Sequence, residues 1–364
     1  MNNISVSQSV LIVGGYGVVG EQASTIFRQR FPEVPLLLAG RSPSGASMLT
    51  ESLGNADAIQ LDVMSERPLD VLTEKPVAVL SVVNDPYNYL LADCLRLGIP
   101  YLDITRWTEV MCEAVVQSSF VDIKAPVMLG SAWMAGVTAI VTKAASKGFS
   151  KINNIDIDVL FALADKSGPN SAEFMDRIAV PFLVTENGEK KLKPSFSEPK
   201  TVSFPGGYTG KTYRFDMPDQ ITLPFTTGAS SVSGRIGFDS ALSTSGLAAL
   251  VKTGVMTLLG HPIFGGLRRS ILHNPGQGAA HEVVISLQGV DDGGRVKRRE
   301  VTMLDPLGQT HLTALGAVVQ LERMLGLDGL PAPSPGIHYP EQHPNIDKAL
   351  ELLQEHGVLI SGLS

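Results

Sequence analysis

The chain has 364 residues, of which 44% are hydrophobic and 18% are charged, and its formal net charge is −7. This length exceeds what a single hydrophobic core usually serves, so we expect two domains. A negative charge without any dense block of Lys and Arg argues against a nucleic-acid partner and against an anionic membrane surface. The expected partner is a small-molecule substrate.

Cysteine and histidine usage bears on compartment and metal content. The two cysteines, Cys94 and Cys112, are too few for a disulfide framework, so we expect reduced thiols. The start, MNNISVSQSV, lacks the basic residues and the long apolar core of a signal peptide, and no apolar stretch reaches the length of a membrane span. The seven histidines show no metal-ligand spacing. We therefore expect a cytoplasmic protein without a metal site.

The first third of the chain alternates between short apolar runs and helical patterns. Residues 10–13 have the composition of a buried parallel strand. An apolar stripe with helical spacing follows and ends at Pro32, with Arg28 off the stripe. Further strands are expected at residues 34–42, 58–63, 77–85, 101–105 and 125–130. Strands separated by helices predict a doubly wound parallel sheet with right-handed crossovers.

A glycine-rich loop follows the first strand. Its sequence, Gly15-Tyr16-Gly17-Val18-Val19-Gly20, fits the pattern G-x-G-x-x-G of dinucleotide-binding loops. In that pattern the first Gly makes a tight turn, the second admits a pyrophosphate, and the third lets helix and strand pack closely. The free N–H groups at the helix N-terminus then face the phosphates. The alternative is a glycine-rich turn that binds nothing.

The end of the second strand indicates which dinucleotide is bound. An NAD enzyme usually carries Asp or Glu about 20 residues after the glycines, where the carboxylate binds the ribose hydroxyls. This chain has Arg41 and Ser42 instead, which can donate charge-assisted hydrogen bonds to a 2′-phosphate. We therefore expect NADP(H), unless Arg41 is simply solvated. Asp62 and Val63, after the third strand, are expected near the adenine, although Asp62 could instead cap a turn.

The fourth strand ends in Val83, Asn84 and Asp85, followed by Pro86 and Tyr87. Ligands of doubly wound sheets bind beyond the carboxyl ends of the strands. Val83 and Asn84 should therefore face the nicotinamide ribose. Asn-Asp-Pro is also good turn chemistry and could cap the following helix. Both roles stay open for Asn84 and Asp85.

Four segments of the N-terminal half resemble the saccharopine dehydrogenase-like family of NAD(P)-dependent oxidoreductases. They are GGYGVVG, LAGRS, CLRLGIPYLDIT and VMLGSAWMAGVTAIV. The last is similar to a strand that leads into a Gly-aromatic-x-Pro-Gly turn, with Ala135 where the family has proline. Near the end, DPLGQTHLTALGAVVQLERMLG and SPGIHYPEQHPNIDKALELLQEHGVLI match more weakly. The resemblance covers most of the chain apart from its middle.

The resemblance implies a fold and a domain order. The expected fold class is α/β, with an N-terminal Rossmann doubly wound parallel sheet plus an α+β substrate and dimerisation domain with an open mixed sheet. Residues 1–130 would bind NADP(H), residues 131–330 would bind substrate and form a homodimer, and residues 331–364 would return to the Rossmann domain. The β-rich alternation after Gly148 agrees, and Asp291–Gly294 (DDGG) predicts a hairpin turn.

Hydride transfer needs an oriented cofactor and one managed proton. The candidate proton donors at the carboxyl edge of the sheet are Asp103, Tyr87 and Asp85. Asp103 also resembles a strand-ending Asp of the family. Other residues are expected to contact the substrate, either as walls of the nicotinamide pocket or as cations: Arg106, Trp133, Met134, Arg177, Arg235, with Arg214 and His261 as further candidates.

These expectations converge on one activity. The chain is predicted to be an NADPH-dependent oxidoreductase that delivers a hydride to an imine or to an activated double bond of a small metabolite. The sequence leaves these two acceptors open. It also leaves open a non-catalytic NADP(H)-binding sensor or scaffold, because the cofactor loop is clear while no proton donor stands out.

Overall fold

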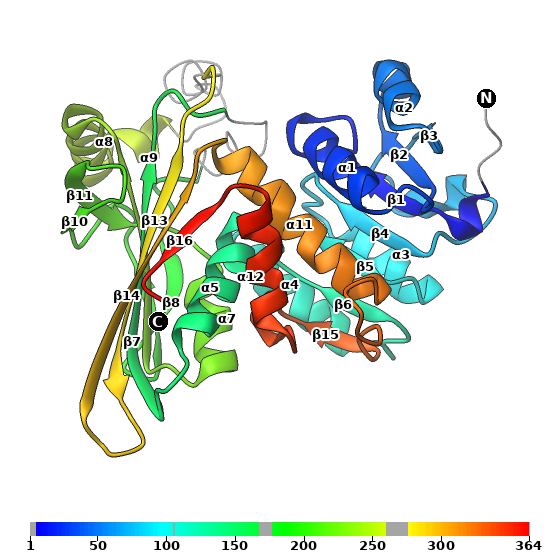
Figure 1. Cartoon of the computed structure of the whole chain (residues 1–364). Coiled ribbons are helices and arrows are strands. Elements are labelled where there is room, and N and C mark those ends of the chain that lie inside the picture. Colours follow the sequence, from blue (N-terminus) through cyan, green and yellow to red (C-terminus); the bar gives the residue numbers. More distant parts are fainter. Residues whose placement is uncertain (1–4, 105, 167–176, 260–275, 364) are drawn as a thin grey trace. The chain divides into compact units, whose positions relative to one another are not determined.

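The structure is a computed structural model that describes residues 5–104, 106–166, 177–259 and 276–363. The chain folds into two compact units, coloured along the sequence in Figure 1. Unit 1 comprises Met1–Arg106, Val110–Val137 and Thr313–His343. Unit 2 comprises Trp107–Glu109, Thr138–Leu312 and Pro344–Ser364. Each unit is built around its own large sheet.

Unit 1 contains a seven-stranded sheet in the order β15-β6-β5-β4-β1-β2-β3, and every neighbouring pair in it is parallel. Six of these strands have the order of a Rossmann sheet, so the expected doubly wound parallel sheet is confirmed. The strands are β1 (Val10–Val13), β2 (Leu36–Gly40), β3 (Ala56–Gln60), β4 (Ala78–Ser81), β5 (Tyr101–Asp103), β6 (Pro126–Met128) and β15 (Gly336–His338).

The helices of unit 1 pack on this sheet because the central strands are apolar on both faces. All four residues of β1 are buried, as are all four of β4. The helices that lie wholly or mainly in the unit are α1 (Val18–Arg30), α2 (Ser47–Leu53), α3 (Tyr89–Leu97), α4 (Thr108–Ser119) and α11 (Gln309–Leu325). Short 3-10 helices are η1 (Val6–Gln8), η2 (Pro43–Ala46), η3 (Pro68–Val71) and η6 (Pro340–Gln342).

The C-terminus of α1 corrects one sequence expectation. Arg28, expected off the apolar stripe, is only 9% exposed. Its guanidinium donates to the backbone carbonyls of Phe31, Pro32, Val34 and Asn55, at 2.6 to 3.2 Å. Carbonyls at a helix end lack intrahelical donors, so a long cationic side chain folded back over them satisfies that need. Burial lowers the pKa of this guanidinium.

Unit 2 contains a second seven-stranded sheet, in the order β10-β11-β12-β7-β13-β14-β16. It is mixed, since β12 and β7 are parallel while the other neighbours are antiparallel. Its strands are β7 (Lys151–Phe161), β10 (Lys200–Ser203), β11 (Thr209–Arg214), β12 (Ser231–Phe238), β13 (His281–Val290), β14 (Val296–Asp305) and β16 (Leu359–Ser361). The expected open mixed sheet is thus present.

A hairpin and several helices complete unit 2. The hairpin consists of β8 (Phe182–Glu186) and β9 (Glu189–Lys193), and the helices of the unit are α5 (Thr138–Ala145), α7 (Asp219–Thr227), α8 (Ala241–Lys252), α9 (Val255–Leu259) and α12 (Ile346–Glu355). The turn predicted at residues 291–294 joins β13 to β14, which pair along their full length. Gly294 has a φ of +73°, which glycine adopts without strain.

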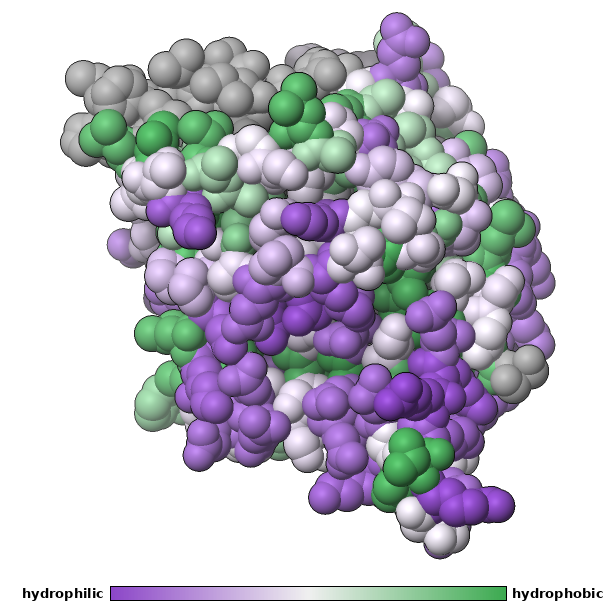
Figure 2. Space-filling model, turned by 90° about the vertical axis from the view of Figure 1, so that its left-hand side faces the viewer, coloured by the Kyte–Doolittle hydropathy of each residue, from purple (hydrophilic) through white to green (hydrophobic). Residues whose placement is uncertain are grey.

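One face of the mixed sheet carries a network of charged side chains. Lys200 contacts Asp156 at 3.1 Å and Asp158 at 2.7 Å, and Arg235 contacts Asp156 at 3.0 Å. These residues come from the neighbouring strands β7 and β12 and from β10. Figure 2, which looks at the side of the molecule that carries this sheet, shows a broad hydrophilic area.

The unit boundaries differ from the expected domains in two places. Residues 131–137 and 313–330, expected in the second domain, lie in unit 1. Residues 344–364, expected to return to the Rossmann domain, lie in unit 2, where β16 pairs with β14. Helix α11 lies beside α1, and Arg30 and Glu322 form an ion pair at 2.5 Å (Figure 1). Such long-range packing has no local sequence signal.

Within the part of the chain that the structure describes, we find no helix with the length and apolar character needed to cross a membrane.

Candidate cofactor and active site

The glycine loop joins β1 to α1 through a turn that leaves no room for side chains at two positions. A Cβ added at Gly20 would lie 2.1 Å from the carbonyl oxygen of Gly14 and 2.7 Å from the Cα of Gly15. A Cβ at Gly15 would lie 2.8 Å from Leu38 on β2. Gly14 itself has a φ of +84°. The helix therefore starts closer to the strand than any other residue type would allow.

The N-terminus of α1 is open. Its N-cap is Gly17, which is exposed and provides no side-chain cap. A Cβ at Gly17 would meet only the Gly14 oxygen, at 3.3 Å. The first N–H groups of a helix have no intrahelical acceptor, and the helix dipole makes this end positive. The Gly17 N–H donates to the Gly14 carbonyl at 2.9 Å, so the donors that fit a pyrophosphate are the N–H groups of Val18, which is exposed, and Val19, which is half-buried.

The end of β2 lies next to this loop. Arg41 and Ser42 are both exposed, and Arg41 forms no ion pair with any residue that the structure describes. The phenol oxygen of Tyr16 accepts a hydrogen bond from the Ser42 N–H at 3.1 Å. The guanidinium is therefore available to an anion at the position where an NAD enzyme usually has a carboxylate.

Asp62 and Val63, which follow β3, differ in their exposure to solvent. Asp62 is exposed, and its carboxylate accepts a hydrogen bond from the Met64 N–H at 3.0 Å. The Asp62 carbonyl accepts from the Ser65 N–H. This is the turn-capping geometry that the sequence left open as the alternative. Val63 is half-buried and packs against the hydrophobic core of unit 1.

The end of β4 lies against the glycine loop at the switch point of the strand order. A Cβ added at Gly14 would lie 2.5 Å from Cγ1 of Val83, so these two loops are in contact. Val83 and Asn84 are partly buried here. In doubly wound sheets, ligands bind at this point, between the two central strands that lead in opposite directions. The structure thus brings Val83 and the glycine loop together at this point of the sheet.

Asp85 lies four residues before the first residue of helix α3 and caps its N-terminus. Its carboxylate accepts hydrogen bonds from the backbone N–H groups of Tyr89, Leu90 and Leu91, at 3.0, 2.9 and 3.3 Å. Asp85 is only 4% exposed, and this burial raises the pKa of the carboxyl group, while the three N–H donors and Arg106 oppose the shift. Three charge-assisted bonds to a helix terminus make a structural cap.

Asp103 and Arg106 form a buried ion pair after β5. The carboxylate of Asp103 accepts from Nε of Arg106 at 2.6 Å and from the N–H of Gly130 at 3.1 Å. The remaining guanidinium nitrogens donate to Asn88 at 2.6 Å, to the carbonyl of Val110 and to the phenol of Tyr101. Every nitrogen of Arg106 therefore has a protein partner, which differs from the free cation expected for a substrate carboxylate.

The same cluster shifts two pKa values. Burial lowers the pKa of Arg106, but the adjacent Asp103 carboxylate outweighs it, so the pKa is raised overall. Burial, reinforced by the Asp103 charge, raises the pKa of the Tyr101 phenol well above its usual value. The guanidinium is thus charged and the phenol neutral at any physiological pH. Asn88, which the sequence did not single out, enters the cluster in a left-handed conformation with a φ of +55°.

The segment after β6 makes an unusual turn, η4 (Trp133–Val137). Met134 is extended, with φ −75° and ψ 141°, and Ala135 is left-handed, with φ +55°. Trp133 is 4% exposed, whereas Met134 is half-buried. Gly316 of α11 packs closely against this turn, since a Cβ there would lie 2.7 Å from the Ser131 oxygen. Of the two expected pocket walls, Met134 is the more accessible.

The remaining candidate cations belong to unit 2. Arg177 pairs with Glu109 at 2.5 Å, and its guanidinium lies 4.8 Å from the centre of the Trp107 ring. Arg235 is engaged in the charged network with Asp156, and Arg214 pairs with Glu198 at 2.8 Å. His261 lies outside the described residues. Three of the four candidates thus serve ion pairs within unit 2.

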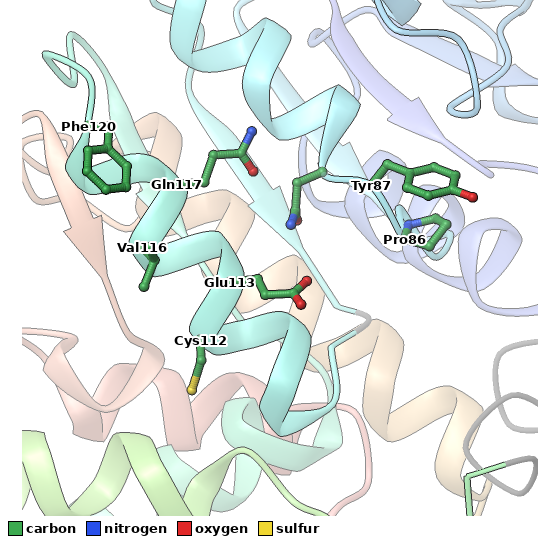
Figure 3. A pocket seen from close by; sticks show the side chains of 8 residues that line it. Pro86, Tyr87, Cys112, Glu113, Val116, Gln117 and Phe120 are labelled. Carbon is green, nitrogen blue, oxygen red and sulfur yellow. The ribbon is translucent and has the colours of Figure 1, made fainter.

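Tyr87 is the most accessible candidate at the carboxyl edge, with 58% of its surface exposed. It borders a groove of about 660 Å³ between the segment 86–88 and helix α4. In Figure 3 its ring points away from the α4 side chains. The other residues of the groove are Pro86, Asn88, Cys112, Glu113, Val116, Gln117 and Phe120. The Tyr87 ring packs against the ring of Tyr89, with 5.3 Å between the ring centres.

Comparison with known proteins supports the fold. Apo histidine-tagged saccharopine dehydrogenase (L-Glu forming) from Saccharomyces cerevisiae superposes with a TM-score of 0.63 at 15% identity, over 98% of this chain and 100% of that chain. The expected resemblance is thereby confirmed at the level of the fold. No family model and no curated protein matches the sequence.

Two further structures are similar at lower scores. GenD2 from gentamicin A biosynthesis, in complex with NAD, has a TM-score of 0.44 at 12% identity, over 99% of this chain and 98% of that chain. A mutant of meso-dapdh from Clostridium tetani has a TM-score of 0.46 at 9% identity, over 96% of this chain and 99% of that chain.

Proposed function

We propose that this protein is an NADPH-dependent oxidoreductase that delivers a hydride to an imine or an activated double bond of a small metabolite. The observation that carries the proposal is the pairing of two features in unit 1. The uncapped N-terminus of α1 fits a pyrophosphate, and Arg41 is exposed beside it without an ion-pair partner among the described residues.

The residues of unit 1 divide the binding task between them. The N–H groups of Val18 and Val19, at the start of α1, would hold the pyrophosphate. Arg41 and Ser42 would hold the 2′-phosphate, and Val83 would lie against the ribose next to the nicotinamide. NADPH, when bound, supplies the hydride. A carboxylate in place of Arg41 would repel the 2′-phosphate, which is why we favour NADP(H) over NAD(H).

Among the three candidate proton donors, the contacts favour Tyr87. Asp103 is committed to Arg106 and Gly130, and Asp85 is committed to the start of α3. Tyr87 is exposed at the carboxyl edge of the sheet, and its phenol can donate a proton to the atom next to the one that receives the hydride. Met134 would wall the acceptor. We place the protein in the cytoplasm as a homodimer with one small-molecule substrate.

A second candidate function has an observation in its favour. Two of the three candidate proton donors, Asp103 and Asp85, have their carboxylates engaged by other groups of the protein. The cations Arg106, Arg177 and Arg235 all form ion pairs within the protein. A protein that binds NADP(H) and changes its interactions with partners, without turnover, would have this pattern. Substrate-dependent consumption of NADPH separates the two functions.

The cofactor assignment is tested by direct titration. We expect the protein to bind NADPH more tightly than NADH, and Arg41→Asp to weaken NADPH binding by about tenfold or more, because a charge-assisted pair becomes a repulsive one. Intrinsic fluorescence quenching measures both dissociation constants. Arg67→Asp, also on the surface of unit 1, is the control for a change in net charge. Equal NADPH affinities in wild type and Arg41→Asp would refute the 2′-phosphate contact.

The activity is tested by following the absorbance of NADPH with a panel of cyclic imines and enones. We expect at least one acceptor to be reduced. Tyr87→Phe should then lower kcat by about 10²-fold or more while leaving the dissociation constant of NADPH unchanged, because general acid catalysis contributes on this scale. Tight NADPH binding without turnover across the panel would favour the sensor.

A further inference from the structure

Tyr16 connects the loop that would contact the pyrophosphate with the loop that would contact the 2′-phosphate. Its backbone belongs to the glycine loop, while its phenol oxygen accepts a hydrogen bond from the Ser42 N–H, 3.1 Å away at the end of β2. The ring lies directly over Gly40, since a Cβ added there would be 2.2 Å from the phenol oxygen and 2.6 Å from Cζ. Only glycine, which has no Cβ, leaves room for this ring at position 40.

This contact constrains the residues that face a 2′-phosphate. Arg41 stands between Gly40, which the ring covers, and Ser42, whose N–H the phenol holds. Arg41 and Ser42 are themselves exposed, and no described residue forms an ion pair with Arg41. The backbone of this short segment is thus fixed from the glycine loop, while its side chains point to solvent. Fixing the backbone that carries this cation before the ligand arrives reduces the entropy lost on binding.

We propose that Tyr16 is a positioning residue for cofactor choice, which holds Arg41 and Ser42 where they meet the 2′-phosphate of NADP(H). This role rests on the proposed function. Tyr16 acts on one end of the cofactor, because its phenol contacts the β2 loop while its ring leaves the N-terminus of α1 uncovered. Loss of the phenol should therefore weaken ligands with a 2′-phosphate and spare those without one.

Four probes and one substitution test this. NADPH, NADH, 2′,5′-ADP and 5′-AMP are titrated against wild type and Tyr16→Phe, which keeps the ring and removes the hydrogen bond to Ser42. We expect NADPH and 2′,5′-ADP to bind Tyr16→Phe about three- to tenfold more weakly. NADH and 5′-AMP should change by less than about twofold. Tyr208→Phe, in unit 2, is the matched control and should leave all four dissociation constants unchanged.

A second variant approaches the same contact from the other side. Gly40→Ala places a methyl group where the ring lies, so the ring must move, and the loss should again be selective for the 2′-phosphate probes. The double variant Tyr16→Ala/Gly40→Ala removes the clash, so adding the methyl group should then cost no further affinity. Circular dichroism and the thermal midpoint verify that each variant is folded before titration.

The outcomes distinguish this inference from the function on which it rests. Wild type that binds neither NADPH nor NADH would refute the proposed function, and the role of Tyr16 with it. Wild type that prefers NADPH, combined with variants that lose affinity equally for all four probes or for none, would overturn the role of Tyr16 alone. A selective loss in Tyr16→Phe and Gly40→Ala establishes it.

Discussion

Asp103 and Arg106 show how one buried pair can resemble catalytic chemistry in a sequence. In the sequence, a strand-ending Asp followed three residues later by Arg resembles a catalytic acid beside a cationic side chain that binds the substrate. In the structure each side chain is 2% exposed and each is the other's partner at 2.6 Å. Breaking a buried pair leaves an uncompensated charge, which is more costly than losing both partners.

Asp103→Asn is therefore expected to lower the free energy of unfolding by about 3–5 kcal/mol, because Arg106 stays charged in a buried site. Urea denaturation followed by circular dichroism measures this. The double variant Asp103→Asn/Arg106→Met, which removes both charges, should be the more stable of the two. If Asp103→Asn kept its stability and lost only turnover, Asp103 would be a catalytic acid instead of a structural partner.

At the scale of elements, the turn η4 explains a departure of this chain from the family it resembles. The family has proline where this chain has Ala135, and Ala135 has a φ of +55°. Proline is locked near −65°, so it cannot adopt this turn. The left-handed backbone at Ala135 therefore requires a residue other than proline, and the turn differs from the one that the family pattern implies.

Ala135→Pro is accordingly expected to destabilise the protein by more than about 1 kcal/mol, since the native φ is incompatible with the ring. Ala135→Gly is the matched control, because glycine accepts a positive φ, and it should lie within about 1 kcal/mol of wild type. Thermal and urea unfolding compare the two variants. An Ala135→Pro variant as stable as wild type would mean that the turn readily changes its shape.

The elements that the sequence predicted share a local cause. The strands of the Rossmann sheet and helix α1 follow from apolar runs, helical spacing and the glycine loop, all of which act within a few residues. Arg28 was misplaced because its guanidinium folds back over the carbonyls that follow α1 and also reaches the carbonyl of Asn55, 27 residues along the chain. Helix α11 was assigned to the wrong domain because Glu322 pairs with Arg30 across 292 residues of sequence. Contacts of that range leave no periodic signal.

The candidate site divides in the same way. The glycine loop and Arg41 were predictable because their spacing is itself the chemistry. The engagement of Arg106 and Arg235 was not, because a sequence shows that a residue is charged but not whether the fold supplies its partner. For Asp85 the sequence left two roles open, and the structure shows the helix cap. The same holds for the phenol of Tyr16, which reaches a backbone N–H 26 residues away.

At the scale of the whole molecule, two buried groups of unit 2 make opposite contributions to the pH dependence of stability. Burial raises the pKa of Asp165 to about 6, with the nearby Asp305 charge adding to the shift and the Gln309 and Lys166 N–H groups opposing it. Burial lowers the pKa of His281 to about 3. The two side chains are 3.9 Å apart, from Oδ2 to Nδ1.

The signs follow from which state of the chain holds the proton. Between about pH 4 and 6 the folded state keeps a proton on Asp165 that the unfolded chain has lost, so this group makes stability fall as pH rises. Between about pH 3 and 6.5 the unfolded chain holds a proton on His281 that the folded state excludes, so this group makes stability rise with pH. From about pH 4 to 6 the two slopes cancel.

Removing one group should reveal the other. Relative to wild type, His281→Phe is expected to lose about 1.4 kcal/mol of unfolding free energy for each unit that the pH rises between about 4 and 6, because only the Asp165 slope remains. Asp165→Asn should change by the same amount in the opposite direction, and the double variant should follow wild type. Urea midpoints at several pH values give these slopes whatever the absolute stability of each variant. Parallel curves for wild type and His281→Phe would mean that His281 keeps its proton in the folded state.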